Sequence, residues 1–242
     1  MLIRRFSQHL REQNWFAVAL DFLVVVLGIF IGLQVADWNQ ARLDRQEAEY
    51  HLSFLYSELS REIASAEAEI ERSEQVLERS FQAVQLLIRD EWEEEDLQRF
   101  DDLLLATYEL WGPRHRPVSL RRMIDDGKLD LIDSKALQRA ILQFESAYLD
   151  AIEQTDTSYS YSLVVTPQIT ASVKYMGPDV ISTPAELRSN ETLRSAVRDK
   201  AIWQRIQFDE LIKMQEARLR LKKILEDSLG ESVLDSAAAL EG

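Results

Sequence analysis

One segment of this sequence is long and apolar enough to cross a lipid bilayer: WFAVALDFLVVVLGIFIGLQVADW, from Trp15 to Trp38. As an α-helix it would extend roughly 35 Å, against a hydrocarbon core of about 30 Å. The tryptophans at its two ends, Trp15 and Trp38, match the aromatic residues that lie at membrane interfaces. We therefore expect a transmembrane helix that contacts membrane lipid, with the rest of the chain attached to it.

A cleavable signal peptide is the alternative interpretation of this segment, because basic residues precede its apolar core. A cleavage site needs small residues one and three positions before the cut. Ala36 fits the first position, but Gln34 fits the other poorly. The chain has no cysteine, which excludes a lipoprotein anchor and any disulfide. The sequence favours a retained anchor.

The orientation of the span follows from the basic residues on its two sides. Arg4, Arg5 and Arg11 precede it, whereas Arg42 and Arg45 follow it closely. Because cytoplasmic flanks carry the excess of positive charge, the count favours a cytoplasmic N-terminus. We expect a single-pass protein of the bacterial inner membrane with its C-terminal domain in the periplasm; an intracellular tether of inverted orientation stays open.

The charge of the chain is unevenly distributed. Its 242 residues carry a net charge of -14, which disfavours nucleic acid as a partner. Residues 44–102 contain eighteen Asp or Glu and six Arg, whereas residues 191–223 contain nine Lys or Arg and five acids. This asymmetry predicts that an acidic early helix lies beside a basic late helix.

Glycine and proline are rare enough to outline the helices. Neither residue occurs between Gly32 and Gly112, between Gly127 and Pro167, or between Pro184 and Gly230. Such stretches, rich in Leu, Ala, Glu, Arg and Gln, are typical of helices. We predict an all-α protein in which one N-terminal transmembrane helix continues into a long amphipathic helix, with an antiparallel helical bundle outside the membrane. The predicted parts are a basic segment (1–14), the span (15–38), the helical domain (39–230) and a flexible tail (231–242), whose AAALE resembles a vector-derived sequence.

The first long helix is predicted to run from Trp15 to Ile88 without a break. Its apolar or small residues recur with a mean spacing of 3.6, which favours a straight amphipathic helix over the 3.5 repeat of a coiled coil. The positions that define this stripe are Leu52, Leu55, Leu59, Ile63, Ala66, Ile70, Ser73, Leu77, Phe81, Val84 and Ile88.

Later boundaries follow from capping and turn residues. We expect helices at Leu97–Leu110 and Ser119–Asp126, the second ended by Gly127. Asp133 is the expected N-cap of a helix from Ser134. Further on, Thr183, Pro184 and Glu186 form a capping box, and the last helix is expected to end near Gly230. The segment TDTSYSYS, residues 155–162, is either a polar helix face or a loosened stretch before Pro167.

Two parts of the sequence carry a resemblance. The span ends in LGIFIGLQVADWNQAR and leads into a long helix that starts at Glu47–Leu52, and SLRRMIDDGKLDLIDSKALQRAIL follows later. These features are similar to those of a bacterial family of single-span membrane proteins of unknown function. The resemblance implies fold and topology only, and it supplies no catalytic residue.

Within the span, Gly28 and Gly32 form a G-x-x-x-G step that Ala36 extends. Their spacing places them on one helical face together with Asp21. Small residues allow two helices to approach closely, so we expect a helix contact there with another membrane subunit or a second copy. The alternatives are that the glycine pair is incidental, that Asp21 reaches back to the interface, or that Asp21 belongs to an ion pathway.

A basic cluster occurs in WGPRHRPVSLRR: Arg114, His115, Arg116, Arg121 and Arg122. Prolines on both sides of His115 stiffen this loop, so its guanidinium groups are candidates to bind a carboxylate, a phosphate or a lipid headgroup. The alternative is that these arginines pair with the acids between Arg89 and Asp102.

Catalytic and metal-binding motifs are missing from the sequence. His9, His51 and His115 have no His or Cys partner at ligand spacing, and the aspartates around Gly127 do not follow the spacing of a calcium loop. No phosphate-binding loop or nucleophile motif occurs either. We expect no metal, no cofactor and no enzyme activity.

These observations favour a membrane-anchored accessory or scaffolding subunit that docks through its span and its projecting helical domain onto a larger membrane protein assembly. A ligand-sensing helical ectodomain that acts through a partner is the alternative.

Overall fold

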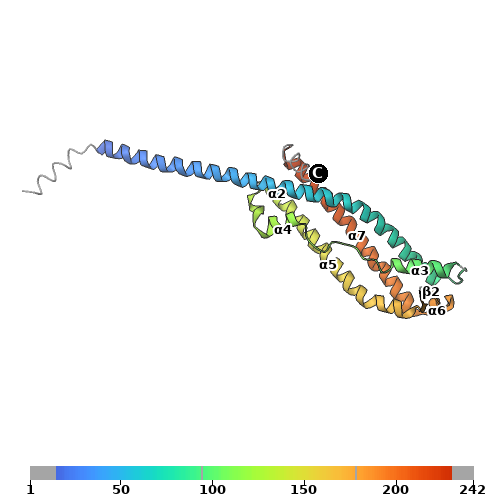
Figure 1. Cartoon of the computed structure of the whole chain (residues 1–242). Coiled ribbons are helices and arrows are strands. Elements are labelled where there is room, and N and C mark those ends of the chain that lie inside the picture. Colours follow the sequence, from blue (N-terminus) through green and yellow to red (C-terminus); the bar gives the residue numbers. More distant parts are fainter. Residues whose placement is uncertain (1–14, 94, 178, 231–242) are drawn as a thin grey trace, which may run out of the picture. The chain divides into compact units, whose positions relative to one another are not determined.

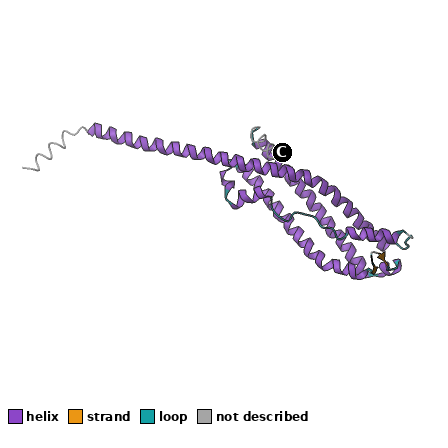
Figure 2. Ribbon diagram, viewed as in Figure 1, coloured by secondary structure: helices purple, strands orange, loops and turns teal. Residues whose placement is uncertain are grey.

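The computed structural model describes residues 15–93, 95–177 and 179–230, and the side chains of 15–17 and 179 are not among the described ones. The predicted basic segment 1–14 and the tail 231–242 lie outside the described residues. Most of the described residues are helical, as predicted (Figure 2). The elements in chain order are α2 (Trp15–Ile88), α3 (Asp96–Ala106), α4 (Val118–Asp125), the 3-10 helix η1 (Lys128–Leu131), α5 (Lys135–Ser172), β1 (Tyr175–Met176), β2 (Asp179–Val180), α6 (Pro184–Ser189) and α7 (Glu191–Ser228).

The chain divides into two units, residues 1–48 and 49–242. The first contains the apolar beginning of α2. The second contains the remainder of α2 and all later elements. Helix α2 is continuous from Trp15, the first described residue, to Ile88, where the prediction also ends it, and the absence of glycine and proline after Gly32 agrees with its unbroken course.

In the second unit, α2, α5 and α7 lie side by side (Figure 1). The hydroxyl of Tyr56 donates to Glu226 at 2.9 Å, and the amide of Gln215 donates to the carbonyl of Ile63 at 3.2 Å. Residue numbers rise along α2 as they fall along α7, so the two helices are antiparallel. These contacts place the acidic part of α2 beside the basic helix α7, as the opposite charges of the two segments predict.

Helix α5 also packs along α7. Lys200 donates to Ser162 at 2.6 Å, and the Arg218 guanidinium lies 5.9 Å from the ring centre of Tyr148. Residue numbers again rise in one helix as they fall in the other. Helix α7 is therefore antiparallel to both α2 and α5.

The buried face of α2 corrects the predicted spacing. Buried positions recur every seven residues, at Leu52, Leu59, Ala66, Ser73, Ser80 and Leu87. Near the end of the helix the predicted stripe is wrong: Phe81 and Val84 are only half-buried and Ile88 is exposed, whereas Ser80, Ala83 and Leu87 are buried. The physical reason is that a helix that follows its neighbours keeps a 3.5-residue period, so the inward position near its end is Ser80 and not the apolar Phe81 beside it.

The same seven-residue spacing defines the buried faces of the other two long helices. In α5 the two buried series are Leu137, Phe144, Ala151, Ser158, Val165 and Ile141, Tyr148, Thr155, Ser162, Ile169. In α7 they are Leu193, Lys200, Gln207, Met214, Leu221 and Val197, Gln204, Leu211, Arg218, Leu225. Each series contains apolar residues at its ends and polar ones within it.

One end of this unit is a compact apolar cluster. There the last turns of α2 and α5 meet α3, α6 and the first turns of α7. Phe100 of α3 is fully buried, with its ring centre 5.2 Å from that of Trp92. Leu187 of α6 and Leu193 of α7 are also fully buried here. The cluster fixes the connections between the long helices.

Several predicted helix ends hold, and two are corrected. Thr183 and Glu186 form the reciprocal capping box, and Gly127 adopts the left-handed conformation, with φ 69°, after α4. The cap of α5 is Ser134 in place of the predicted Asp133, because the Ser134 hydroxyl accepts the N–H of Leu137. Helix α5 also continues through Pro167, so residues 155–162 belong to a helix face. Helix α3 ends at Ala106, four residues before the predicted end.

Candidate functional site

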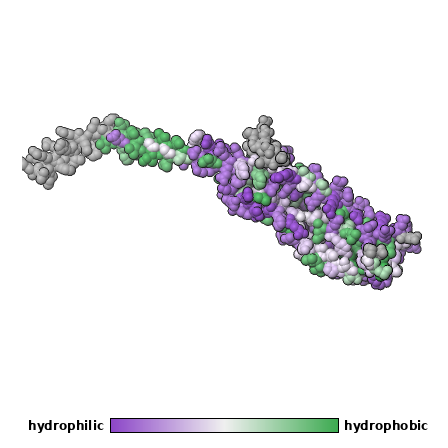
Figure 3. Space-filling model, viewed as in Figure 1, coloured by the Kyte–Doolittle hydropathy of each residue, from purple (hydrophilic) through white to green (hydrophobic). Residues whose placement is uncertain are grey.

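The apolar beginning of α2 is exposed throughout. From Val18 to Leu43 every side chain is exposed, including Phe22 at 70%. Most of the visible surface of its apolar segment is hydrophobic (Figure 3). A helix of this length and composition is able to cross a membrane.

The predicted contact face of this helix is open within the described chain. A β-carbon added at Gly28 or at Gly32 would meet no other atom within 4 Å, and Asp21 and Ala36 are exposed. Of the predicted interface tryptophans, Trp38 is 68% exposed, and the side chain of Trp15 lies outside the described residues. The face is therefore available to a helix from another molecule.

The predicted basic cluster is divided by its contacts. Arg116 donates to Glu145 at 2.5 Å and to Asp125 at 3.1 Å, and the hydrogen bond to Glu145 raises the pKa of this guanidinium. Arg114 lies over the ring of Tyr159, with 5.4 Å to its centre. The remaining members, His115, Arg121 and Arg122, are exposed and have no such side-chain partner among the described residues.

The alternative for this cluster, pairing with acids of residues 89–102, is not what the structure has. No ion pair in the described part of the chain joins the cluster to that segment. The partners of Arg116 come from α4 and α5, because the loop after α3 returns along the long helices and carries the arginines away from the acidic bend (Figure 1).

The start of α4 is bound by a carboxylate of α2. Glu58 accepts the backbone N–H groups of Val118 at 2.9 Å and of Ser119 at 2.8 Å, and it also accepts the Ser119 hydroxyl. A carboxylate at a helix N-terminus satisfies unpaired N–H groups and complements the helix dipole. The chain itself thus supplies the anion bound at the N-terminus of α4.

A partly buried ion pair connects α2 to α7. The guanidinium of Arg218, 7% exposed, donates to Glu62 at 3.1 Å. Burial raises the pKa of Glu62 even though the neighbouring charge of Arg218 lowers it. The basic run RLRLKK at residues 218–223 is, from its sequence alone, a further candidate to meet a lipid headgroup or an acidic partner. Arg218 instead pairs with Glu62 inside the helical unit. The ammonium of Lys222 lies 5.3 Å from the ring centre of Tyr56.

A polar layer crosses the middle of the three long helices. Lys200 of α7 is 1% exposed, and its ammonium donates to Ser162 of α5. Ser80 of α2 lies eighteen residues after Glu62, and Lys200 lies eighteen residues before Arg218. Because the two helices are antiparallel and Glu62 pairs with Arg218, Ser80 lies at the level of Lys200. The described residues offer Lys200 no carboxylate, so burial lowers its pKa to about 8.

Two glutamines of this layer hold the loop between α3 and α4. The amide of Gln204 donates to the carbonyls of Ala106 at 2.8 Å and Glu109 at 2.9 Å, and the amide of Gln207 donates to that of Trp111 at 2.9 Å. These bonds replace helical partners that the chain loses where α3 ends. They fix an irregular segment against α7.

Gly112 allows this loop to lie close to α5. Its φ is 123°, and an added β-carbon would lie 2.3 Å from the Thr155 hydroxyl oxygen. Any other residue would clash there and would adopt an unfavourable backbone conformation. The loop therefore depends on glycine at this position.

Sequence reasoning missed the polar layer. A signal was present, since Lys200, Gln204 and Gln207 continue the three-and-four spacing of Leu193 and Val197. A scan that accepts only apolar residues as inward-facing ends at these positions. The serines and threonines of residues 155–162 carry the same signal in α5.

The described residues contain no group of three or more His, Cys, Asp or Glu side chains arranged to hold a metal ion. Comparisons with protein-family models, with curated proteins and with solved structures find no match. The functional proposal therefore rests on the geometry of this chain.

Proposed function

We propose that this protein is a membrane-anchored accessory or scaffolding subunit. Residues 15–38 cross the bilayer, and the chain docks through this span and its helical domain onto a larger membrane protein assembly. The later helices form an antiparallel bundle outside the membrane. The proposal includes a cytoplasmic N-terminus, a periplasmic domain and membership of the single-span family that the junction after the span resembles.

The observation that carries the proposal is the exposure of the apolar segment. Its side chains have no cover from the described chain, and in water this surface would be far larger than the isolated apolar residues of soluble proteins. Lipid or a second membrane helix would cover it.

Replacement of Gly28 and Gly32 by isoleucine tests the docking role of the span. Bulk on this face separates two helix backbones, so we expect the double variant to lose its partner, or its second copy, on mild detergent extraction of native membranes. Val26→Ile with Phe30→Ile is the matched control, because these positions lie on the opposite face. An unchanged complex in the glycine variant would refute the role of this face.

Protease accessibility tests the topology. A protease added to intact spheroplasts should remove the domain after Trp38 and leave an N-terminal tag protected. Protection of both ends would contradict the proposed orientation. Release of the whole chain by carbonate washing would contradict the span itself.

A further inference from the structure

The last part of α5 contains the longest uncharged segment of the chain. Seventeen residues, from Thr157 to Val173, include no Asp, Glu, Lys or Arg. The uncharged core of the span is shorter, with fifteen residues from Phe22 to Ala36. Helices at the surface of a domain usually carry charged residues on their outer side. In a chain of which 29% is charged, an uncharged outer side indicates a surface that another molecule covers.

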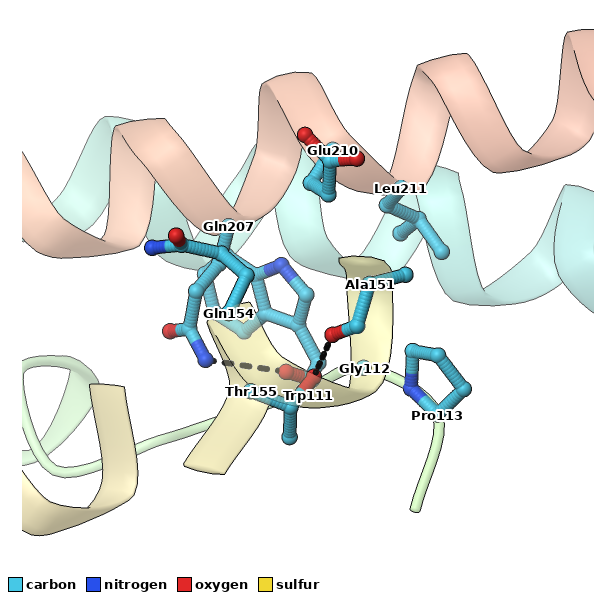
Figure 4. Close-up of a pocket in the computed structure, with 9 residues that line it drawn as sticks. All are labelled: Trp111, Gly112, Pro113, Ala151, Gln154, Thr155, Gln207, Glu210 and Leu211. Carbon is cyan, nitrogen blue, oxygen red and sulfur yellow. Dashed lines mark hydrogen bonds between the residues drawn. The ribbon is translucent and has the colours of Figure 1, made fainter. Parts of the chain in front are cut away.

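The chain itself covers two sides of this part of α5. Helix α7 covers one of them, where Lys200 donates to the hydroxyl of Ser162 at 2.6 Å. The loop between α3 and α4 covers another, where Gly112 passes Thr155 (Figure 4). The remaining side faces away from these contacts.

That remaining side is exposed and largely apolar. Leu163 is 61% exposed and Val164 is 63% exposed. In Figure 3 a group of white and green residues lies around the last turns of α5. We define the α5 outer face by six exposed residues that follow one another at helical spacing: Thr157, Ser160, Leu163, Val164, Pro167 and Thr170.

Covering the α5 outer face would leave few polar groups without partners. The hydroxyl of Thr157 donates to the carbonyl of Glu153 at 2.9 Å, and that of Thr170 donates to the carbonyl of Thr166 at 3.2 Å. Because these protons are already bound within the helix, the two hydroxyls cost little to bury.

One backbone group of the face lacks its usual donor. Pro167 has no N–H, so the carbonyl of Leu163 does not receive the hydrogen bond that a helical residue four positions later would donate. A surface that covers this face should therefore bring a donor to this carbonyl. A hydroxyl group is sufficient, and no charge is needed.

We propose that the α5 outer face binds the same face of a second copy of this chain. A symmetric contact places a surface against its own equivalent, so a surface with charges of one sign repels its copy. This repulsion matters in a chain with a net charge of -14. The α5 outer face carries no charge, and the Ser160 hydroxyl of one copy is able to donate to the Leu163 carbonyl of the other.

The preceding turns of the same helix show the contrast. Leu149 is 47% exposed and lies fourteen residues before Leu163, at the same position of the seven-residue repeat. Asp150, Glu153 and Asp156 are exposed beside it. Two copies that met through this part of α5 would bring carboxylates of equal charge together, so the contact is expected to begin after Asp156.

The contact is small and rests on the proposed function. From Thr157 to Thr170 the face is roughly 20 Å long, about the length of four helical turns. It offers much less than the ~800 Å² per partner that stable dimers bury. Two copies anchored in one bilayer meet at a high effective concentration, which makes a weak contact sufficient.

Cysteine crosslinking of the full chain in membranes tests the contact, because the natural sequence has no cysteine. Leu163→Cys and Val164→Cys, each treated with a short bismaleimide, should give a product of twice the mass of the chain. Leu149→Cys is the matched control and should stay monomeric. A crosslink to a product of any other mass would assign the face to a different protein and would overturn the proposal, as would equal crosslinking of Leu149→Cys or no crosslink at either position.

A charge exchange tests whether the two faces meet each other. In Val164→Cys copies, Leu163→Glu on both partners, or Leu163→Lys on both, should lower the crosslink yield about tenfold, and one Glu copy with one Lys copy should restore it. Unchanged yields in all combinations would also overturn the contact. Carbonate washing separates this result from the proposed function: a chain that stays in the membrane without crosslinking contradicts the α5 contact alone, whereas a chain that is washed out contradicts the span.

Discussion

Replacement of Lys200 by methionine should stabilise this protein. The ammonium of Lys200 lies at the interface of α5 and α7 with Ser162 as its hydrogen-bond partner. A charge buried without a counter-charge opposes folding, because the unfolded chain exposes it to water. Methionine has nearly the same length and no charge, and Ser162 keeps a second contact, with the Thr166 hydroxyl at 3.2 Å.

The size of the effect follows from the pKa of Lys200. Burial lowers this pKa from 10.5 to about 8. At 1.36 kcal/mol for each pKa unit, the buried charge costs roughly 3 kcal/mol at pH 7. Between pH 8 and 10.5 the unfolded chain binds more protons than the folded one, so the contribution of this group to stability rises with pH in that range and levels off below pH 8. From pH 7 to 9.5 the wild type should gain about 2 kcal/mol from this group.

Urea unfolding of the full chain in mild detergent, followed by circular dichroism, measures both effects. The variant should exceed the wild type by about 3 kcal/mol at pH 7 and by about 1 kcal/mol at pH 9.5. Lys213→Met, at an exposed position of the same helix, is the control and should change stability by less than about 0.5 kcal/mol. A destabilised Lys200→Met, or a difference from wild type that does not shrink with pH, would refute the reasoning.

Three further substitutions test the contacts that position the loop and the helices. Gly112→Ala should lower the free energy of unfolding by about 2 kcal/mol, because of its positive φ and its clash with Thr155; no change on thermal unfolding would show that the loop adapts. Glu62→Gln leaves the buried Arg218 without its counter-charge and should cost about 2–3 kcal/mol in urea unfolding, more than Glu69→Gln at an exposed position of the same helix. Thr183→Ala removes the capping box of α6 and should cost about 1 kcal/mol, with Thr183→Ser close to wild type; equal melting of the two variants would argue against the cap.

Much of the helical outline could be predicted from residues that act locally. Breakers and caps depend on neighbours in sequence, which is why the unbroken course of α2, the left-handed Gly127 and the capping box of Thr183 agree with the structure. Charge asymmetry also predicted the pairing of α2 with α7. The end of α3 at Ala106 depends on a tertiary contact instead, because the amide of Gln204, about a hundred residues away in the sequence, donates to the carbonyl of Ala106.

The candidate site was less predictable, since its chemistry depends on which residues become buried. Arg116 and Arg218 look alike in sequence, because each belongs to a run of basic residues. In the structure Arg116 pairs with Glu145 of α5, and Arg218 pairs with Glu62 of α2. Lys200 looks like a surface lysine until its place in the seven-residue series is recognised. Counting polar residues at inward positions would have identified the layer, because the helical period alone decides which positions face inward.

The polar layer gives the three long helices a register that apolar contacts would leave open. Two helices with apolar residues every seven positions pack almost equally well after a shift of one heptad. In the observed register Lys200 reaches Ser162 and Gln204 reaches the carbonyl of Ala106, and a shift of about 10 Å along α7 would remove both partners. The charge of Lys200 costs stability in the folded state, but it costs more in the register that places Ile169 beside it in place of Ser162, because no hydroxyl receives it there. The lysine thus lowers stability and at the same time separates the native pairing from this competing register.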